Sequence, residues 1–210
     1  MSTIPTRNQA SAVRKPREER WSEILDAATE LFYHKGYEGT SLQEIAEKLG
    51  IMKGSLYYYI RSKEDILFVV LNTTHQAGLE NMVRMAGMGG TALDRLRNMI
   101  VGHIQYIGDN LIRTAVFLNE MKSLPQEAQD RILGGEVSYP KLFENVLREG
   151  LEEGTIKGDL DPRLTATIVL GSLNSTYRWL HPERAGNTQK VADYFSRILI
   201  TGLKSGNTED

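Results

Sequence analysis

No cysteine occurs in the sequence. This absence excludes disulfides, zinc fingers with thiolate ligands and thiol catalysis, and it is typical of a protein from a reducing cytoplasm. No run approaches the roughly 18 apolar residues of a membrane span. The basic N-terminal segment has no apolar core after it, unlike a signal peptide. We therefore expect a cytoplasmic protein that has no membrane partner.

Motifs for catalysis, metals and cofactors are missing as well. The four histidines (His34, His75, His103 and His181) lie far apart in the sequence and form no HxxxH or HxxE pair. There is no GxSxG, no Walker loop and no GxGxxG that opens a helix after a strand. We expect no enzyme activity, no metal site and no cofactor.

Strand patterns are also lacking. Short apolar runs such as residues 198–200 lie inside longer helical patterns. The hydrophobic content of 40% and the charged content of 25% are normal for a soluble globular protein. We predict an all-α fold, with breaks at the glycines of residues 87–90 and at residues 134–140. The predicted helices cover residues 17–35, 42–49, 53–59, 63–86, 92–107, 111–121, 125–133, 141–153, 162–179 and 188–203.

A helix-turn-helix is predicted between Ser41 and Lys63. Ser41 is a good N-cap and Glu44 completes a capping box. Gly50 stands where the first helix ends, because glycine adopts a left-handed backbone at low cost. The second helix begins near Lys53, directs Leu56 inward, and would enter a major groove.

The second helix carries side chains that suit DNA. Lys53 can donate to guanine or phosphate, Gly54 permits close approach, and tyrosine hydroxyls can reach phosphates. An ordinary helical hairpin with a tyrosine cluster in its core is the alternative. The predicted DNA contacts are Ser41, Gln43, Lys53, Gly54, Ser55, Tyr57, Tyr59 and Lys63.

Positive charge gathers beside this motif although the net charge is −2. Residues 1–17 carry four basic side chains and no acidic one. Such an arm can follow phosphates or enter a minor groove, or it can be a solubilising tail. We divide the chain into a flexible basic arm (1–16), a three-helix DNA-binding domain (17–63) and a larger helical domain (64–210).

Two segments resemble a known family. GTSLQEIAEKLGIMKGSLYYYIRSKEDIL (residues 39–67) resembles the DNA-binding motif of the TetR family of bacterial transcriptional repressors, and ILDAATELFYHKGYEGTS (residues 24–41) resembles its first helix. Met52 departs from the small hydroxyl residue that many members carry, so the cap of the second helix should be weak. The resemblance implies a homodimer on a palindromic operator, released by a small effector.

The last two predicted helices, residues 162–179 and 188–203, could form half of a four-helix dimer interface or could close the core of a single chain. The resemblance favours the dimer, and we expect Leu170 and Phe195 to lie in its seam. LGSLNSTYRWLHP (residues 170–182) and VADYFSRIL (residues 191–199) resemble the C-terminal region of TetR-family members that regulate fatty-acid and sterol catabolism. Several of those members respond to acyl-coenzyme A thioesters, which makes an acyl-CoA a candidate effector.

The larger domain is interpreted as a binding cavity. Its methionines could line an adaptable apolar site or could simply fill gaps in a helical core. His103 and Tyr106 could be a polar element of the cavity or a satisfied buried pair, while Arg178 could meet an anionic effector or a structural partner. A helical ligand carrier or enzyme with an incidental helix-turn-helix is the competing class. The predicted effector site comprises Met82, Met99, His103, Tyr106, Phe117, Met121, Phe143, Leu147, Asn174, Tyr177 and Arg178.

Overall fold

The computed structural model describes residues 16–181, 183 and 187–206. Over these residues the chain is helical and has no strand, which confirms the all-α prediction; one isolated bridge pairs Ile156 with Lys204. The basic side chains predicted for the arm, apart from Arg17, lie outside the described residues. The α-helices are α1 (Arg17–Lys35), α2 (Leu42–Lys48), α3 (Lys53–Leu56), α4 (Lys63–Ala86), α5 (Ala92–Asp109), α6 (Leu111–Glu120), α7 (Gln126–Leu133), α8 (Tyr139–Glu152), α9 (Pro162–Asn174) and α10 (Asn187–Leu203).

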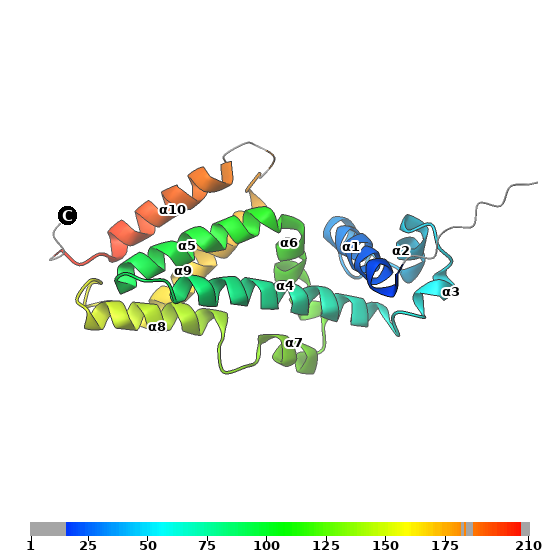
Figure 1. The fold of residues 1–210 in the computed structure, drawn as a ribbon, viewed down its shortest axis with the longest axis horizontal. Helices are drawn as coiled ribbons and strands as arrows, with labels where there is room; N and C mark the ends of the chain where they lie inside the picture. Colours follow the sequence, from blue (N-terminus) through cyan, green and yellow to red (C-terminus); the bar gives the residue numbers. More distant parts are fainter. Residues whose placement is uncertain (1–15, 182, 184–186, 207–210) are drawn as a thin grey trace, which may run out of the picture.

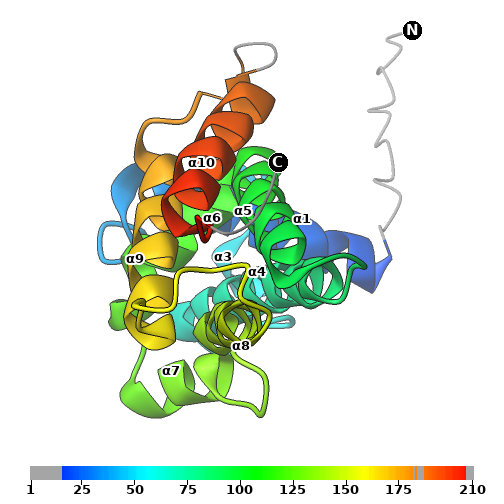
Figure 2. The same ribbon diagram turned by 90° about the vertical axis from the view of Figure 1, so that its left-hand side faces the viewer.

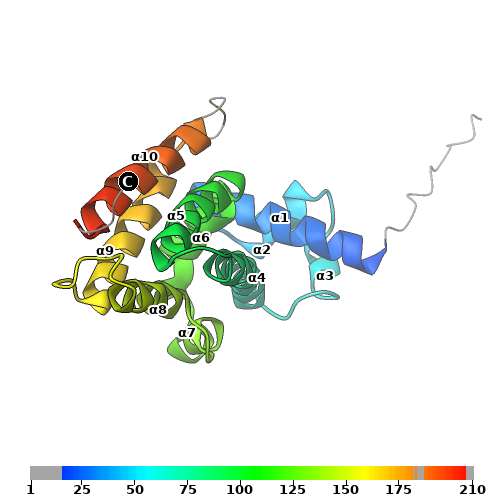
Figure 3. The ribbon, with the colours of Figure 1, turned by 60° about the vertical axis from the view of Figure 1, so that its left-hand side comes forward.

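Helices α1, α2 and α3 form a small unit at one end of an elongated molecule, and α4 runs from this unit into the larger group of helices (Figure 1). Helix α10 packs on α5, and α8 packs on both α5 and α9. Figures 2 and 3 show α9 and α10 along the same side of the larger group. Short 3₁₀ turns follow α6 (Met121–Ser123) and α9 (Ser175–Arg178).

Local capping determines where four of the helices begin. Capping boxes close the N-termini of α2, α4 and α5 through Ser41, Ser62 and Thr91. Asp161 caps α9 by accepting from the Leu164 N–H. The predicted starts of these four helices are confirmed.

Several predicted boundaries are wrong. The second helix of the helix-turn-helix, predicted to reach residue 59, ends at Leu56. Helix α8 begins at Tyr139 and not at residue 141, because Pro140 falls in the first turn, where a missing N–H costs no helical hydrogen bond. The helix predicted to reach residue 179 ends at Asn174 and tightens into the 3₁₀ turn.

Two hydrophobic cores share helix α4. Its first half contributes Ile66, Leu67, Val70 and Leu71 to the core of the DNA-binding unit. Its second half contributes Met82 to the core of the larger domain. A rigid helix therefore connects the two cores.

Helices α6 and α7 also reach the core of the DNA-binding unit. Val116 of α6, Ile132 of α7 and the intervening Leu124 are buried in it. The DNA-binding unit therefore rests on α6 and α7 as well as on α4.

Candidate functional site

The helix-turn-helix is held by short polar contacts and a small apolar core. The N–H of Glu44 donates to Ser41 Oγ over 3.2 Å, and the N–H of Ser41 donates to Glu44 Oε2 over 2.8 Å. Gly50 has φ +65° at the turn, the left-handed conformation that glycine adopts without strain. Leu56 is buried, so α3 is fixed from below and presents its other face outward.

The outward face of α3 carries most of the predicted DNA contacts. Lys53, Gly54 and Tyr57 are exposed, while Ser55 and Tyr59 are half-buried. A Cβ built on Gly54 would meet no atom of the protein within 4 Å. The chain itself therefore does not require glycine there, and space for an outside partner remains.

The weak cap predicted for the second helix of the motif is confirmed. Met52, at the N-cap of α3, makes no side-chain capping bond and is 80% exposed. Sequence reasoning missed Tyr58, which is 82% exposed. The burial of Leu56 and Ile60, one turn apart, shows that the intervening Tyr57 and Tyr58 must point outward.

Three other predicted contacts have partners inside the protein. The Ser41 hydroxyl donates to Glu44, and the Gln43 side-chain amide donates to Glu47 over 2.8 Å. The Lys63 ammonium donates to the carbonyls of Tyr37 and Thr40 over 2.7 and 2.8 Å. Lys63 therefore ties the segment between α1 and α2 to the start of α4, and its contact with DNA stays a prediction.

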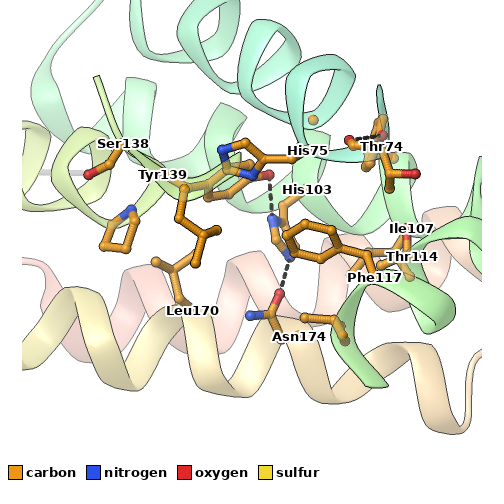
Figure 4. A pocket seen from close by; sticks show the side chains of 15 residues that line it. Thr74, His75, His103, Ile107, Thr114, Phe117, Ser138, Tyr139, Leu170 and Asn174 are labelled. Atoms are coloured by element: carbon orange, nitrogen blue, oxygen red, sulfur yellow. Dashed lines mark hydrogen bonds between the residues drawn. The ribbon is translucent and has the colours of Figure 1, made fainter. Parts of the chain in front are cut away.

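A cavity of about 450 Å³ lies in the larger domain. Six helices, α4 to α9, contribute to its wall (Figure 4). None of the described residues that line it is Asp, Glu, Lys or Arg. They are Thr74, His75, Gly78, His103, Tyr106, Ile107, Thr114, Phe117, Leu118, Leu133, Ser138, Tyr139, Pro140, Leu170 and Asn174.

Four residues of the predicted effector site line this cavity: His103, Tyr106, Phe117 and Asn174. The other seven do not line it. Inward-facing apolar side chains meet one another in a close-packed core and leave no space for a ligand. The four that are buried in this way are Met82, Met99, Phe143 and Leu147.

The remaining three lie elsewhere. Met121 packs against the core of the DNA-binding unit. The Tyr177 hydroxyl bonds to Asn119 Oδ1 over 2.5 Å, and Arg178 Nε donates to that hydroxyl over 3.1 Å. Arg178 thus has a structural partner, as one of the two alternatives proposed.

A buried hydrogen-bond chain crosses the cavity wall. With Asn174 presenting its carbonyl oxygen, His103 Nε2 donates to it over 3.1 Å, and His103 Nδ1 accepts from the Tyr139 hydroxyl over 2.8 Å (Figure 4). Burial lowers the pKa of His103 to about 4, because the charged imidazolium loses its hydration. Burial also raises the pKa of Tyr139. Both groups are therefore uncharged at neutral pH.

His103 and Tyr106 do not form the pair that their spacing suggested. The Tyr106 hydroxyl donates instead to the Thr74 carbonyl over 2.8 Å. His103 and Tyr106 both line the cavity, which favours the alternative of a polar element in a ligand site.

The sequence analysis did not predict five polar residues that line the cavity: Thr74, His75, Thr114, Ser138 and Tyr139. His75 stacks on Phe117 with ring centroids 5.7 Å apart, and burial lowers its pKa. Thr114 is 7% exposed, and its hydroxyl has no hydrogen-bond partner in the described part of the chain. Three consecutive residues of α6, 114–116, are buried, and this could have indicated Thr114 as a cavity residue. No sequence motif marks it.

Helices α9 and α10 each expose large apolar side chains. Leu164 and Ile168 of α9 are each 60% exposed, and Tyr194 and Ile198 of α10 are 55% and 56% exposed. We call these four residues the α9–α10 face. Leu170, predicted to lie in the dimer seam, is instead buried against the cavity.

Phe195, also predicted for the seam, is half-buried and stacks on Trp179. It packs against the core of the larger domain. The outward positions of α10 belong instead to Tyr194 and Ile198, which lie on the other side of the helix.

Within the described ranges, no group of three His, Asp or Glu side chains is placed to hold a metal ion. None of the helices in that part of the chain combines the length and the apolar character needed to cross a membrane.

A helix-turn-helix unit that shares a helix with a cavity-bearing domain is the architecture of a ligand-responsive DNA-binding regulator. Residues 24–70 match bacterial regulatory proteins of the tetR family, and residues 89–203 match the tetracyclin repressor-like C-terminal domain. The chain belongs to the TetR family, whose members are transcriptional regulators. This assignment decides against a carrier or enzyme with an incidental helix-turn-helix.

Several relatives share the whole architecture. The fatty acid metabolism regulator protein of Bacillus subtilis (strain 168) is 24% identical, over 90% of this chain and 98% of its own. The ketosteroid transcriptional regulator KstR2 of Mycobacterium tuberculosis has the same fold, with a TM-score of 0.83, 24% identity and coverage of 89% and 95%. AibR in complex with isovaleryl coenzyme A and operator DNA has a TM-score of 0.78, 27% identity and coverage of 86% and 98%.

Proposed function

We propose that the protein is a cytoplasmic repressor that binds a palindromic operator as a homodimer and releases it when a small, largely apolar effector enters the cavity. An acyl thioester is the leading candidate for this effector. The likeness to AibR, which has been seen with isovaleryl coenzyme A and operator DNA, supports both parts of the proposal.

The proposed DNA surface is the exposed side of α3. Lys53 reads a base or holds a phosphate, Gly54 lets the DNA backbone come close, and Tyr57 donates to phosphates. We add Tyr58 because it is the most exposed of the three tyrosines. Of the remaining contacts proposed from sequence, Ser41, Gln43, Ser55 and Tyr59 flank this surface and would reach DNA at its edge.

The proposed dimer forms through the α9–α10 face. The four large apolar side chains that α9 and α10 expose are costly in water, and a second copy would bury them. The two copies would then hold their α3 helices about one DNA turn apart, roughly 34–36 Å, as adjacent major grooves require.

The position of Phe117 carries the effector proposal. Phe117 lines the cavity and also packs against the core of the DNA-binding unit. Its ring stacks on His75 of α4, the helix that both cores share. An effector that moves Phe117 would therefore act on α4 and α6 together. Such an effector must bind the released conformation more tightly than the DNA-bound one, since equal affinity for both shifts nothing.

The test measures fluorescence anisotropy of a labelled duplex from the region flanking the gene. Acyl-CoAs, free fatty acids and steroid acids are added to the preformed complex. A coupling of about 1–3 kcal/mol would weaken DNA binding roughly 5- to 150-fold. Release by an unrelated polar metabolite, with no response to any apolar compound, would refute the effector proposal and leave the DNA-binding half intact.

A further inference from the structure

Most polar side chains on the cavity wall are already bonded inside the protein. The Tyr106 hydroxyl donates to the Thr74 carbonyl, and the Thr74 hydroxyl donates to a carbonyl one turn earlier in α4. Both ring nitrogens of His103 are engaged, one with the Tyr139 hydroxyl and the other with Asn174. A ligand that forms a hydrogen bond in the cavity must therefore use one of the groups that remain.

Three of the remaining polar side chains do not select a ligand. The Thr114 hydroxyl oxygen is buried below the accessible surface, and Figure 4 shows the Ser138 hydroxyl pointing away from the other labelled side chains. His75 stacks on Phe117 and has no hydrogen-bond partner in the described part of the chain. Because a neutral imidazole offers a donor on one nitrogen and an acceptor on the other, His75 can bond to either kind of ligand group.

The amide of Asn174 in α9 has one open end. Its Oδ1 is taken by His103 over 3.1 Å, whereas its Nδ2 has no partner among the described residues. Only two side-chain polar atoms of those residues, Arg95 Nε and Thr114 Oγ1, are both unpaired and buried, so the unpaired Asn174 Nδ2 is accessible. Figure 4 shows this nitrogen on the side of Leu170, pointing away from His103. Since Asn174 lines the cavity, its N–H groups are available to a ligand.

A chain of hydrogen bonds determines which end of the Asn174 amide is open. The pKa of His103 is lowered to about 4, so the ring is neutral at pH 7 and has one donor and one acceptor. The Tyr139 hydroxyl has no acceptor among the described residues except His103 Nδ1, which leaves the imidazole proton on Nε2 and requires the amide oxygen opposite it. The reverse arrangement would leave both the Tyr139 O–H and the Asn174 oxygen without partners, and it is less stable for that reason.

The chemistry of the wall restricts the ligand group that meets Asn174. No Lys, Arg, Asp or Glu is among the described residues that line the cavity, so an ionised group would lose hydration without gaining a charged partner. The open end of Asn174 supplies only donors, and its partner must be an acceptor. An uncharged carbonyl oxygen meets both conditions.

The volume limits what can enter. A water-sized group occupies about 30 Å³, so a cavity of about 450 Å³ holds roughly 15 non-hydrogen atoms, far fewer than coenzyme A contains. Leu133 and Pro140 are the exposed residues among those that line the described cavity, and they mark its opening. An acyl group with its carbonyl would fit inside, while coenzyme A would remain at this opening.

We propose that Asn174 determines the ligand specificity of the cavity: its side-chain N–H groups donate to an uncharged carbonyl oxygen of the effector, and His103 and Tyr139 hold the amide in the orientation that this bond requires. In an acyl thioester this oxygen is the thioester carbonyl. Asn174 touches the ligand, whereas His103 and Tyr139 are positioning residues. The proposal rests on the proposed effector function.

The test compares octanoyl-CoA with S-octyl-CoA, the thioether that lacks only the carbonyl oxygen, by isothermal titration with the unmodified protein. Octanoyl-CoA should bind roughly three- to tenfold more tightly, as one added hydrogen bond allows. Asn174→Leu replaces the amide by an apolar side chain of similar size and should abolish this preference. Equal affinities in the unmodified protein, a preference that persists in Asn174→Leu, or no binding of either compound overturns the proposal.

Two matched variants test the positioning role, because each removes one tyrosine hydroxyl from the cavity wall. Tyr139→Phe frees His103 to adopt either tautomer, and the Asn174 amide can then turn either end to the ligand. If the two orientations are equally populated, the carbonyl preference falls about twofold. Tyr106→Phe removes a hydroxyl that bonds to Thr74, outside this chain of hydrogen bonds, and should leave the preference unchanged. An equal response of both variants would overturn the positioning role of Tyr139.

Nitrogen NMR of protein labelled in its histidine rings tests the orientation without a ligand, and it needs no folded Asn174→Leu protein. Protonated and bare nitrogens of a neutral imidazole have distinct chemical shifts, and a His103→Gln spectrum identifies the signals of His103. The proton of His103 should lie on Nε2. A proton on Nδ1 would mean that Asn174 turns its oxygen to the ligand, and it would overturn the proposal.

Operator release separates this proposal from the proposed function. Binding with the carbonyl preference but without release of operator DNA would refute the proposed effector function and support the role of Asn174. Release by both compounds at equal concentrations, with equal affinities, would support the function and refute the role of Asn174.

Discussion

Arg113 of α6 and Asp26 of α1 form an ion pair, with Arg113 Nη2 2.5 Å from Asp26 Oδ1. Arg113 directly precedes the cavity residue Thr114, and Asp26 lies in the first helix of the DNA-binding unit. The ion pair therefore joins a wall of the cavity to the unit that we propose to meet DNA.

We predict that Arg113→Gln weakens the effect of ligand on operator affinity by at least about threefold, a loss within the usual range of coupling energies. Both side chains are partly exposed, so the free energy of unfolding should fall by less than about 1 kcal/mol. Operator affinity is measured with and without a releasing thioester. Glu30→Gln is the control, because the Lys48–Glu30 pair of 2.5 Å lies wholly within the DNA-binding unit. Equal loss of coupling in both variants would contradict a specific role for the Arg113–Asp26 pair.

Gly54→Ala should separate DNA binding from stability. A Cβ at Gly54 meets nothing within 4 Å, and Gly54 does not have a positive φ. Alanine should therefore leave the free energy of unfolding unchanged or raise it by about 0.4–1 kcal/mol. Operator affinity should nevertheless fall at least about tenfold if the DNA backbone comes as close as we propose.

The matched control is Gly158→Ala, between α8 and α9, where an added Cβ also meets nothing within 4 Å and φ is not positive. It should change stability in the same way and leave DNA binding alone. Normal operator affinity of Gly54→Ala in an anisotropy titration would show that α3 does not approach the duplex closely.

Lys63 and Lys53 are both predicted from sequence as DNA contacts, but they should differ in what they contribute. Lys63→Met removes two hydrogen bonds from a charged donor and a contact 4.1 Å above the Tyr37 ring, so it should lower the free energy of unfolding by about 1–3 kcal/mol. Lys53→Met should leave unfolding unchanged and weaken operator binding by about 1–3 kcal/mol. Urea unfolding and DNA titration of both variants measure the contrast; a stable Lys63→Met protein would be evidence against this assignment.

The helix-turn-helix could be predicted from sequence because its determinants are local. Ser41 and Glu44 are three residues apart, and Gly50 ends the helix that they begin, so neighbouring residues alone carry the information. Lys63 could not be placed in this way. Its partners, Tyr37 and Thr40, are more than 20 residues earlier, and only the folded chain brings them together.

The cavity was harder to predict. Periodicity shows that Met99 faces inward, yet it does not show whether an inward side chain meets another side chain or empty space. Met99 and Phe143 meet the core, while Thr114 and Tyr139 meet the cavity. That distinction depends on how α4, α6 and α8 diverge, which no single segment of sequence specifies.

Stability should decrease when the pH is lowered through the range in which free histidine titrates. The pKa of buried His103 is about 4, against 6.5 for an unperturbed histidine. Between these values the unfolded chain binds a proton that the folded chain does not, so the folded state is favoured as pH rises. The contribution of His103 is fully present above about pH 6.5 and is lost progressively down to about pH 4, with a total of about 3 kcal/mol.

Urea unfolding of the unmodified protein and of His103→Gln, at pH 7 and pH 5 and at one fixed protein concentration, measures this contribution. The variant should be less stable at pH 7 but should lose less stability on acidification. An identical loss in both proteins would show that His103 is not the group responsible.

The α9–α10 face should control the oligomeric state. Ile168→Glu and Ile198→Glu each place a charge on a side chain that is more than half exposed in the single chain, so each variant should fold. A two-fold interface repeats the charge on both partners. Because two unpaired carboxylates would then have to be buried, the variants should dissociate into monomers.

The matched control is Val83→Glu on α4, where the replaced side chain is 46% exposed and lies outside the α9–α10 face. This variant should stay dimeric. Light scattering at micromolar concentration and circular dichroism give the mass and the helix content. A monomeric unmodified protein, or a dimer that survives both substitutions, would place the interface elsewhere. If the interface is here, the monomers should also lose operator affinity, because a single α3 helix binds only half of a palindromic site.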